Sequence, residues 1–591
     1  MKTRTLMLAV SVAALAVAGC GKKSESQTAS QTDQPAAAAS AASASEADPW
    51  PDFMATFLDK YFAFNPTFAV YQGKHEFDGN LPDWSADGVA ANIDFRKKAI
   101  ADARAIDASK LSDAEKFERD YMTRVMDGEV FWLETADWPH KNPAFYVGSL
   151  DPSPYLMRPY ADKATRMKAF IKYLQNVPAA AVQIKQNLQL PLPATYLKYG
   201  QAGFDGFADF YTTGGKEAFA DVDDPELQSE LDAAATAASA AMKDLSDHLG
   251  TVDATPDGFA LGADKFSAML KRTEDVDISL DDLEAAGRAD LKRNQDALNS
   301  ACEAYAPGET MAACMLKMQS NKPVDGPVEA ARKQLPTLEA FVRAKDLVSI
   351  PGEEQALVEE SPPYNRQNSA YIDPPGPYDK GIPSVYYISP PDPSWDEATR
   401  AAYIPGKDDL LFTSVHEVWP GHFLQFLHAN RVKSIFGRLF VGYAFAEGWA
   451  HYTEEMVVEA GLNDGDPETK IGQISNALLR DCRFLSAIGL HAKGMTVEQS
   501  DNLFRTECYQ DAGTAKQQAA RGTYDPAYLN YTMGKLMIRK LRADWLAKHY
   551  PDGGGREGWK EFHDDFLSYG GPPIPLVRQQ MMGDDEAKAV F

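Results

Sequence analysis

The chain has 591 residues, of which 44% are hydrophobic, 11% aromatic and 24% charged, a composition typical of a globular protein. Its 85 acidic residues against 59 lysines and arginines give a formal net charge of -26. Because such a surface repels polyphosphate, the charge argues against a nucleic-acid partner. The length suggests two to four domain-sized units or one large helical body.

The first residues are typical of a targeting signal. Basic residues precede an apolar run at residues 6–17, which is too short to span a bilayer and ends in "VAGC". The pattern resembles a bacterial lipoprotein signal at residues 1–19, which implies cleavage before Cys20 and lipidation of that cysteine. By the same resemblance, Gly21 favours the outer membrane, with the protein facing the periplasm or the cell exterior. The alternative is an ordinary secreted protein with a chance "GC".

Residues 20–47 are predicted to form a lipidated, disordered tether. After the cysteine the segment contains no aromatic or branched apolar residue, so it cannot offset the entropy lost on ordering. Flexible-chain scaling gives it a reach of roughly 30 Å, enough to hold a soluble body away from the membrane.

Helical periodicity dominates after Trp50, and alternating strand patterns are rare. The sequence therefore predicts a mostly α-helical body with a small β element. Ser279 or Asp281, and Thr496, are expected to cap helices at their N-termini. We expect an N-terminal helical half at residues 48–360 and a C-terminal half at 361–591, with a deep cleft between them.

Four cysteines remain after the lipidation site, and export permits disulfides. Three pairings are possible. Cys302 and Cys314 flank a short loop, and Cys482 and Cys508 lie in one C-terminal region, so we expect these two pairs. The alternative is four buried free thiols. No Cys-x-x-Cys or Cys/His cluster indicates a thiolate metal site.

Residues 361–405 are rich in proline and tyrosine, and their prolines forbid a continuous helix. Within them "SVYYIS", residues 384–389, is the best short strand pattern, and its flanking prolines predict an edge strand. An extended peptide could pair with that edge; equally, the segment could be a surface loop or a crossover between domains.

The stretch "HEVWPGH" begins like the zinc motif His-Glu-x-x-His, in which two histidines four residues apart face one metal. His416 and His422 are six residues apart and would point about 120° away from each other on a regular helix. Pro420 cannot continue the helix and Gly421 is conformationally free, so two residues can loop out and restore the alignment. The alternative is two separately satisfied histidines at a helix break.

A third ligand is expected downstream, in "FAEGWAHYTEEM", because catalytic zinc commonly takes two histidines and a glutamate and leaves one position for water. Glu447, His451 and Glu454 would share one face of an apolar helix, where an unpaired carboxylate is costly. We assign Glu447 as the ligand and Glu454 as a residue that orients a ligand histidine. His451 is a rival ligand, although a core histidine or one behind the ligands is the better interpretation.

Glu417 is the expected general base. Zinc lowers the pKa of a water molecule and polarises a carbonyl, so a neighbouring carboxylate can take the proton of the attacking water and hand it to the leaving amine.

Four ordered motifs, "HEVWPGHFLQ", "AEGWAHYTEE", "LLRDCRFLSAIGLHAKGMTVEQS" and "YDPAYLNYTMGKLMIRKLR", resemble the bacterial family known as domain of unknown function 885. The likeness extends over roughly residues 48 to 585. That family is similar to helical metallopeptidases of the gluzincin type, including angiotensin-converting enzyme and thimet-type oligopeptidases. The resemblance implies a zinc peptidase.

The family pattern marks the same metal-site residues and adds others in the last two motifs: Arg480, Arg483, His491, Arg521, Tyr531 and Gly534. Tyr531 or His491 could donate a hydrogen bond to the tetrahedral oxyanion. Arg521 or Arg483 could hold a substrate carboxylate, while Arg480 is expected behind the ligands. For each arginine the alternative is an internal salt bridge. Departures from the family pattern, which bear on specificity rather than on the ligands, occur at Phe423, His451, Ala487 and Tyr528.

The resulting prediction is a lipid-anchored, zinc-dependent hydrolase of short peptides. One alternative is a peptide-binding envelope lipoprotein without turnover, and another is a metal hydrolase of a non-peptide amide or ester. The sequence leaves the natural substrate, the position of cleavage and the oligomeric state open.

Overall fold

The computed structural model describes residues 48–362, 366, 368–583 and 590–591. The structure is 69% helical with one small three-stranded sheet, which confirms the prediction of a mostly α-helical body with a small β element. The expected signal peptide, Cys20 and the tether lie outside the described residues. Within the described ranges, no helix combines the length and apolar character needed to cross a bilayer.

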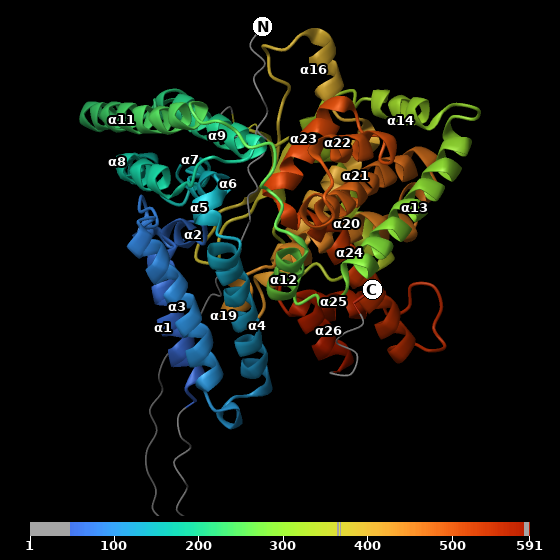
Figure 1. The fold of residues 1–591 in the computed structure, drawn as a ribbon. Coiled ribbons are helices and arrows are strands. Elements are labelled where there is room, and N and C mark those ends of the chain that lie inside the picture. The colour runs from blue at the N-terminus through green and yellow to red at the C-terminus, as the bar shows by residue number, and fades with distance from the viewer. Residues whose placement is uncertain (1–47, 363–365, 367, 584–589) are drawn as a thin grey trace, which may run out of the picture.

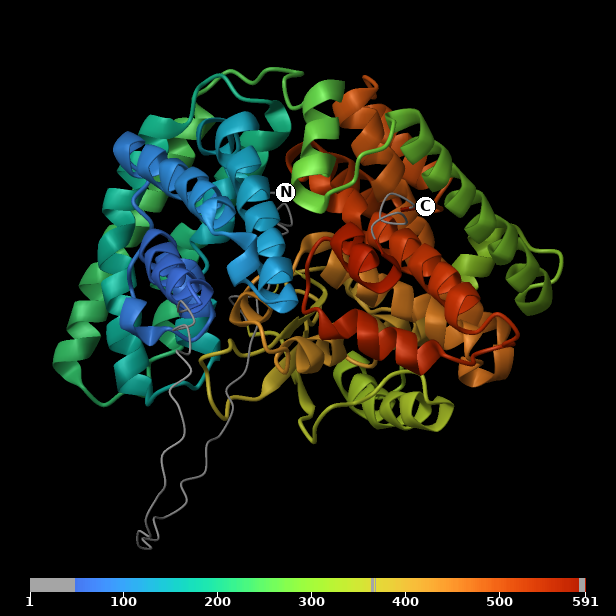
Figure 2. The same cartoon turned by 90° about the horizontal axis from the view of Figure 1, so that it is seen from below.

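The N-terminal helices lie together on one side of the molecule in both ribbon views (Figures 1 and 2). Their amphipathic faces explain why: α1, for example, buries Trp50, Met54, Phe57 and Tyr61 along one stripe. The helices of this group are α1 (Trp50–Phe64), α2 (Pro66–Tyr71), α3 (Ala86–Ala105), α4 (Asp113–Val130), α5 (Trp138–Lys141), α6 (Ala144–Ser149), α7 (Ser153–Met157), α8 (Lys163–Asn187), α9 (Ala194–Thr212), α10 (Gly214–Glu217) and α11 (Pro225–Gly250).

The remaining elements form the other side of the molecule (Figures 1 and 2). Ser279 and Thr496 cap α13 and α22 with their side chains, as predicted. These elements are α12 (Ala263–Glu274), α13 (Leu280–Tyr305), α14 (Met311–Ser320), α15 (Pro327–Lys345), β1 (Ala356–Glu360), β2 (Ala370–Asp373), β3 (Ser384–Ile388), α16 (Glu397–Tyr403), α17 (Lys407–Glu417), α18 (His422–Ala429), α19 (Ile435–Leu439), α20 (Tyr443–Glu459), α21 (Pro467–Ala492), α22 (Val497–Thr506), α23 (Ala512–Tyr524), α24 (Asn530–His549), α25 (Trp559–Ser568) and α26 (Ile574–Met582).

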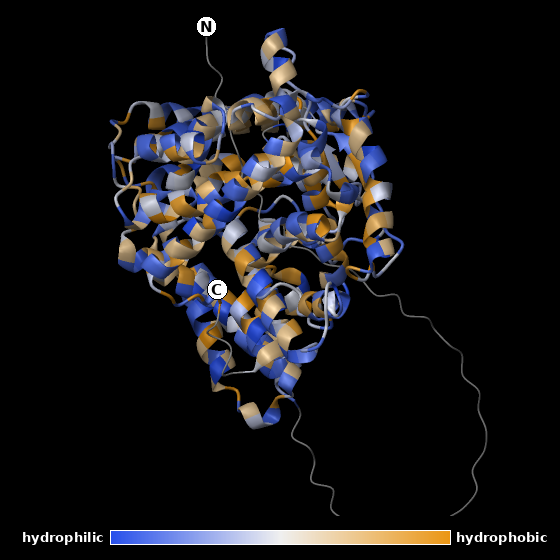
Figure 3. Ribbon diagram, turned by 90° about the vertical axis from the view of Figure 1, so that its right-hand side faces the viewer, coloured by the Kyte–Doolittle hydropathy of each residue, from blue (hydrophilic) through white to orange (hydrophobic). Residues whose placement is uncertain are grey.

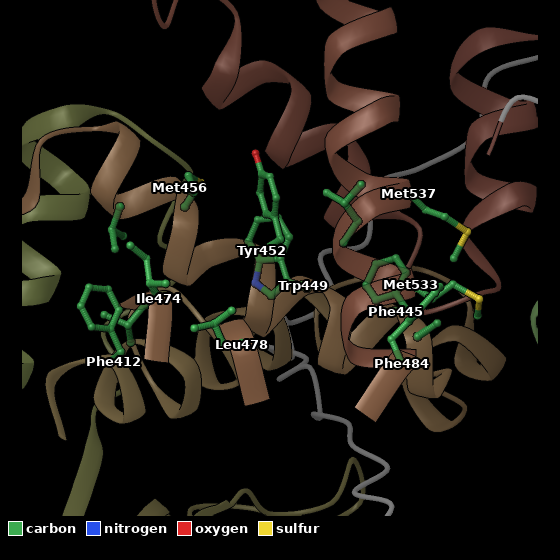
Figure 4. Close-up of a cluster of buried hydrophobic side chains, with 14 of the residues drawn as sticks. Phe412, Phe445, Trp449, Tyr452, Met456, Ile474, Leu478, Phe484, Met533 and Met537 are labelled. Atoms are coloured by element: carbon green, nitrogen blue, oxygen red, sulfur yellow. The ribbon is translucent and has the colours of Figure 1, made fainter. Parts of the chain in front are cut away.

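The largest hydrophobic cluster contains buried residues of α12, α13, α14 and α15 together with residues of the C-terminal helices. Thus α12–α15, which fall within the predicted N-terminal half, share a core with the second half. The two halves and the cleft between them stay predictions. In Figure 4 side chains from α17, α20, α21 and α24 meet in this cluster. Along the helices hydrophilic and hydrophobic residues alternate, as amphipathic packing requires (Figure 3).

Helix α21 runs through this core and is buried on nearly every side. The Cys482–Cys508 disulfide ties it to the segment that follows α22, and Cys302–Cys314 joins α13 to α14. Both predicted pairings are therefore confirmed.

The sheet has the strand order β1-β3-β2, with β3 parallel to β1 and antiparallel to β2. The prediction that residues 384–389 form an edge strand is therefore wrong, because β3 is central. Its flanking prolines, Pro383 and Pro390, lie just outside the strand and remove no donor from the ladder. The free edges belong to β1 and β2, so pairing of an extended peptide with β3 is excluded.

Helices α20 and α24 pack backbone against backbone. A Cβ atom on Gly448 would lie 2.5 Å from the Cα of Gly534, and one on Gly534 would lie 2.1 Å from the carbonyl oxygen of Ala444. Only glycine fits at both positions. This contact brings Glu447 on α20 and Tyr531 on α24 to the same region.

Candidate metal centre

The two histidines of "HEVWPGH" stand on either side of a break between helices. Helix α17 ends at Glu417 and α18 begins at His422, because Pro420 has no N–H with which to continue the helical bonding. The rings of His416 and His422 nevertheless lie close together, with centroids 4.7 Å apart and planes at 87°. The break thus brings the second histidine back beside the first.

Gly421 closes this break. Its N–H donates to the carbonyl oxygen of Val415 at 2.9 Å, and a Cβ atom on it would lie 1.9 Å from the carbonyl oxygen of His416. The buried indole of Trp449 donates to the carbonyl oxygen of Pro420 at 2.9 Å and fastens the break to α20. The Pro-Gly insertion therefore has a defined conformation that no other residue at 421 could adopt.

Glu447 completes a group of three possible ligands with the two histidines. One donor atom from each residue lies within 4.8 Å of the others. Glu447 Oε2 is 3.2 Å from His416 Nε2 and 3.3 Å from His422 Nε2. Tetrahedral ligands bound to zinc at 2.0–2.1 Å are about 3.3 Å apart. Glu447 Oε2 is also buried and has no hydrogen-bond partner among the described residues, so the donor set fits a zinc ion.

The electrostatics of the group favour a cation. Burial opposes ionisation of Glu447, but His422 and His416 hold the pKa of its carboxyl well below the usual range. Burial and Arg480 oppose protonation of His416, whereas the carboxylates of Glu447 and Glu454 raise its pKa to about 9. The protein alone thus concentrates negative charge around the two imidazoles.

Glu454 lies behind His416 and orients it. The 2.7 Å contact from His416 Nδ1 to Glu454 Oε1 places a ring proton on Nδ1. The lone pair of Nε2, the nitrogen that faces Glu447, is then available to a metal. Arg480 forms an ion pair with Glu454 at 3.2 Å, and His451 Nδ1 lies 3.3 Å from the same carboxylate. The structure therefore brings all three residues expected behind the ligands to one place, and His451 takes no part in the ligand group.

His422 is held differently. Its Nδ1 is buried and has no hydrogen-bond partner in the described part of the chain. Its ring stacks on Phe426 with centroids 5.9 Å apart and planes at 14°. Packing rather than a carboxylate therefore sets the orientation of this ring.

Glu417, the expected base, lies at the C-terminal end of α17 beside the sheet. The backbone N–H of Ile372 in β2 donates to its Oε2 at 3.0 Å. Residue 372 pairs with Tyr386 across the ladder, but this N–H is directed to α17 instead. The outer edge of β2 thus holds the Glu417 carboxylate through Oε2. Its Oε1 remains available to accept a proton.

Tyr531 connects the ligands to a group of arginines. Its ring lies 6.3 Å from that of His416, and Tyr443 packs edge-on against it at 5.7 Å. The guanidinium carbons of Arg483 and Arg480 lie 4.9 Å and 5.6 Å from its ring centre. Both arginines face Tyr531 because they are three residues apart on α21.

The arginines differ in their partners. Arg521 forms an ion pair with Asp525 at 2.8 Å and donates to the Tyr443 hydroxyl at 3.0 Å. Arg483 donates from Nε to Gln518 Oε1 at 2.8 Å and forms no ion pair with a described carboxylate. The alternative interpretation, an internal salt bridge, therefore applies to Arg480 and Arg521 but not to Arg483.

The structure does not bring His491 to the ligands, and its expected role as an oxyanion donor is corrected. Nε2 donates to the carbonyl oxygen of Gly522 at 2.7 Å, and Nδ1 faces the N–H of Leu261 at 3.4 Å. Burial lowers the pKa of His491 to about 4, so the ring is neutral and has no second N–H to donate. Its contacts are structural.

Several residues that shape the site were not predicted from the sequence. Asp525, the partner of Arg521, stands four residues after it on the chain, a helical spacing that could have been recognised. Tyr443, Gln518 and Trp449 carry no comparable signal, because their partners lie on other elements.

Two solved structures share this fold. One is a candidate lipoprotein of unknown function from Shewanella oneidensis, with a TM-score of 0.74 and 22% identity over 90% of this chain and 99% of that chain. The other is a candidate lipoprotein from Colwellia psychrerythraea, with a TM-score of 0.76 and 16% identity over 90% of this chain and 98% of that chain. At this identity the likeness concerns the fold.

A search of curated proteins finds no match. The family model of bacterial proteins of unknown function designated DUF885 matches residues 66–581, which include every residue of the candidate centre. The chain therefore belongs to the DUF885 family of bacterial proteins.

Proposed function

We propose that the protein is a zinc-dependent hydrolase of peptide bonds in short peptides. The observation that carries the proposal is the convergence of His416 Nε2, His422 Nε2 and Glu447 Oε2, with separations of 3.2 and 3.3 Å at the shared carboxylate oxygen. That oxygen is buried, and within the part of the chain that the structure describes it has no hydrogen-bond partner, which is costly unless a cation binds there. Two histidines and a glutamate form a common catalytic zinc site.

The three residues would hold the ion, and zinc bound there would supply Lewis acidity toward a water molecule and a carbonyl oxygen. Glu454 keeps the His416 proton on Nδ1, so Nε2 stays available as a ligand. His422 relies on its packing against Phe426 for the same purpose.

The residues around the ligands suit hydrolysis of an amide. Glu417 Oε1 can take one proton from a water molecule as the water oxygen bonds to the carbonyl carbon. The same carboxyl can pass this proton to the leaving nitrogen as the C–N bond breaks. The hydroxyl of Tyr531 can donate a hydrogen bond to the carbonyl oxygen as negative charge develops on it.

Attachment to the cell envelope is part of the proposal. The "VAGC" pattern at Cys20 supports lipidation, and both similar solved structures are described as candidate lipoproteins. Acyl chains on the cysteine would hold the helical body at a membrane without a transmembrane helix. We infer the outer membrane from Gly21.

A peptide library and metal analysis test the proposal together. The purified protein should contain about one zinc per chain and should release new amino groups from a library of short peptides. Glu417→Gln should keep the metal and lose cleavage by a factor of at least about 100. Glu498→Gln, an exposed glutamate on α22, is the matched control and should cleave as the wild type does.

Two outcomes would contradict the proposal. Undiminished cleavage by Glu417→Gln would remove that residue as the base. Zinc-loaded protein that binds peptides but releases no amine would favour a binding lipoprotein, and hydrolysis confined to non-peptide amides or esters would redirect the substrate class.

A further inference from the structure

Arg483 is a buried cation whose side chain lacks an ion-pair partner beside the candidate centre. It is 8% exposed, and no carboxylate among the described residues pairs with it, whereas its neighbours Arg480 and Arg521 are paired with Glu454 and Asp525. Only its Nε is engaged, by Gln518. Its two terminal nitrogens form no hydrogen bond with the residues that the structure describes.

Such an arrangement is unfavourable without a ligand. Burying a charge with no counterion is costly, and Arg521 adds repulsion from a second guanidinium. Burial and Arg521 together lower the pKa of Arg483 to about 10, which still leaves it charged at neutral pH. In a chain with a formal net charge of -26, a counterion from the protein would have been readily available. Its absence at Arg483 points to an anion that arrives with the substrate.

The chemistry of the side chain indicates which anion. A guanidinium presents parallel N–H donors that match the two oxygens of a carboxylate. The engaged Nε fixes the plane of the group through Gln518, so the terminal nitrogens are presented in one orientation. A peptide substrate offers one carboxylate that is always present, at its C-terminus.

The distance to the ligands agrees with such a substrate. The Arg483 guanidinium carbon is 4.9 Å from the Tyr531 ring centre, which is 6.3 Å from the His416 ring centre. Arg483 is therefore at most about 11 Å from the His416 ring. A bound carboxylate takes up about 4 Å of this span. The remainder of at most about 7 Å has room for no more than two residues of about 3.5 Å each.

We propose that Arg483 binds the free C-terminal carboxylate of the peptide, so that the protein acts as a carboxypeptidase that releases one or two residues. This inference rests on the proposed function, because it names the substrate class of the same site. Tyr531 contacts both anchoring points, because its ring centre lies 4.9 Å from the Arg483 guanidinium carbon and 6.3 Å from the His416 ring centre.

The test compares matched peptides on the full protein. A randomised tetrapeptide library is prepared twice, with free C-terminal carboxylates and with C-terminal amides, and the products are read by mass spectrometry. Wild-type protein should cleave the acids at least about 30-fold faster than the amides, because removing one partner of a buried charge pair costs 2–5 kcal/mol. Products should have lost one or two C-terminal residues.

Variants then assign the preference to Arg483. Arg483→Gln should slow cleavage of the acids by about the same factor and leave the amides nearly unchanged, so the preference disappears. Arg483→Lys should restore part of it, since the charge remains but the fork is lost. Arg505→Gln, at a half-exposed arginine on α22 paired with Asp501, should keep the full preference. Thermal melts verify that each variant is folded.

Equal cleavage of acids and amides by the wild type, or cleavage at internal bonds far from the C-terminus, would overturn the inference and leave the proposed peptidase standing. Failure of the proposed function has a different signature, which is no cleavage of either library by the zinc-loaded protein. In that case, capture of the two libraries on immobilised protein decides. Enrichment of acids that Arg483→Gln abolishes supports the role of Arg483 as the carboxylate anchor, and equal capture contradicts it.

Discussion

The indole N–H of Trp449 donates a 2.9 Å hydrogen bond to the carbonyl oxygen of Pro420, and so joins the helix that carries Glu447 to the break between His416 and His422. This bond therefore adds to the contact between Glu454 and His416, which also links the helix of Glu447 to the first histidine.

Replacing Trp449 with phenylalanine should loosen the ligand group. The aromatic ring remains, but the bond to Pro420 is lost and a buried carbonyl is left unpaired, at a cost of about 1–3 kcal/mol. We expect zinc affinity to fall roughly 10-fold, as for other groups that orient ligands. Titration against a competing chelator measures this. Trp395→Phe, at a half-buried tryptophan outside the centre, serves as the control; unchanged zinc affinity in Trp449→Phe would contradict the prediction.

Glu454→Gln should damage both metal binding and stability. The change replaces the charged acceptor of His416 Nδ1 with a neutral amide and leaves Arg480 buried without a carboxylate, which costs about 3–5 kcal/mol. Zinc affinity should fall about 10- to 100-fold. Glu455→Gln, on the same helix as Glu454, is the matched control. It breaks the ion pair with Arg293 of α13 and should lower stability with little effect on zinc affinity. Equal zinc affinities in the two variants would show that Glu454 does not orient the ligand.

Gly534→Ala should separate α20 from α24. The new methyl group would lie 2.1 Å from the carbonyl oxygen of Ala444, and neither backbone can yield. We expect the free energy of unfolding to fall by about 3 kcal/mol or more, together with loss of activity. Gly554→Ala, where no atom lies within 4 Å, should be neutral. Denaturant unfolding of both variants is the measurement, and a Gly534→Ala protein as stable as Gly554→Ala would disprove the close contact.

His75 should make stability depend on pH. Its ring contacts Asp78 and Asp379, both at 3.0 Å. Although burial opposes protonation, these carboxylates raise its pKa from 6.5 to about 9. Because the folded-state pKa is the higher one, the stabilisation is complete below pH 6.5 and is lost as the pH rises through 9.

We therefore expect His75→Gln to be less stable than the wild type at pH 6.5 by on the order of 2 kcal/mol, after allowance for partial exposure. At pH 10 the two proteins should unfold alike. Denaturant titrations of metal-free protein across this range test the prediction, with His549→Gln, at an exposed histidine, as the control. A constant difference between His75→Gln and the wild type at every pH would contradict it.

Local chemistry explains what the sequence could predict. Pro420 and Gly421 have specific backbone properties, so the return of His422 to His416 could be expected before any coordinates. The helical body, two helix caps and both disulfides followed from periodicity, polar side chains before apolar runs and cysteine spacing.

The rest depends on contacts between distant segments. Strand β3 lies in the centre of the sheet because β1 and β2 pair with it on either side. The prolines that flank β3 could not reveal these two partners. His491 meets the backbone of Gly522 and Leu261, and Arg483 differs from Arg521 only through its partners. Residue type gives the range of roles open to such side chains, and the tertiary neighbours select one.

The close approach of Gly448 and Gly534 fixes the separation of the helices that carry Glu447 and Tyr531. If side chains made this contact, substitutions could change the distance between the helices. Here two glycine backbones make it, so there is no side chain whose size could be changed. The spacing of Glu447 and Tyr531 is therefore set by two backbones, and mutation cannot adjust it without separating the helices.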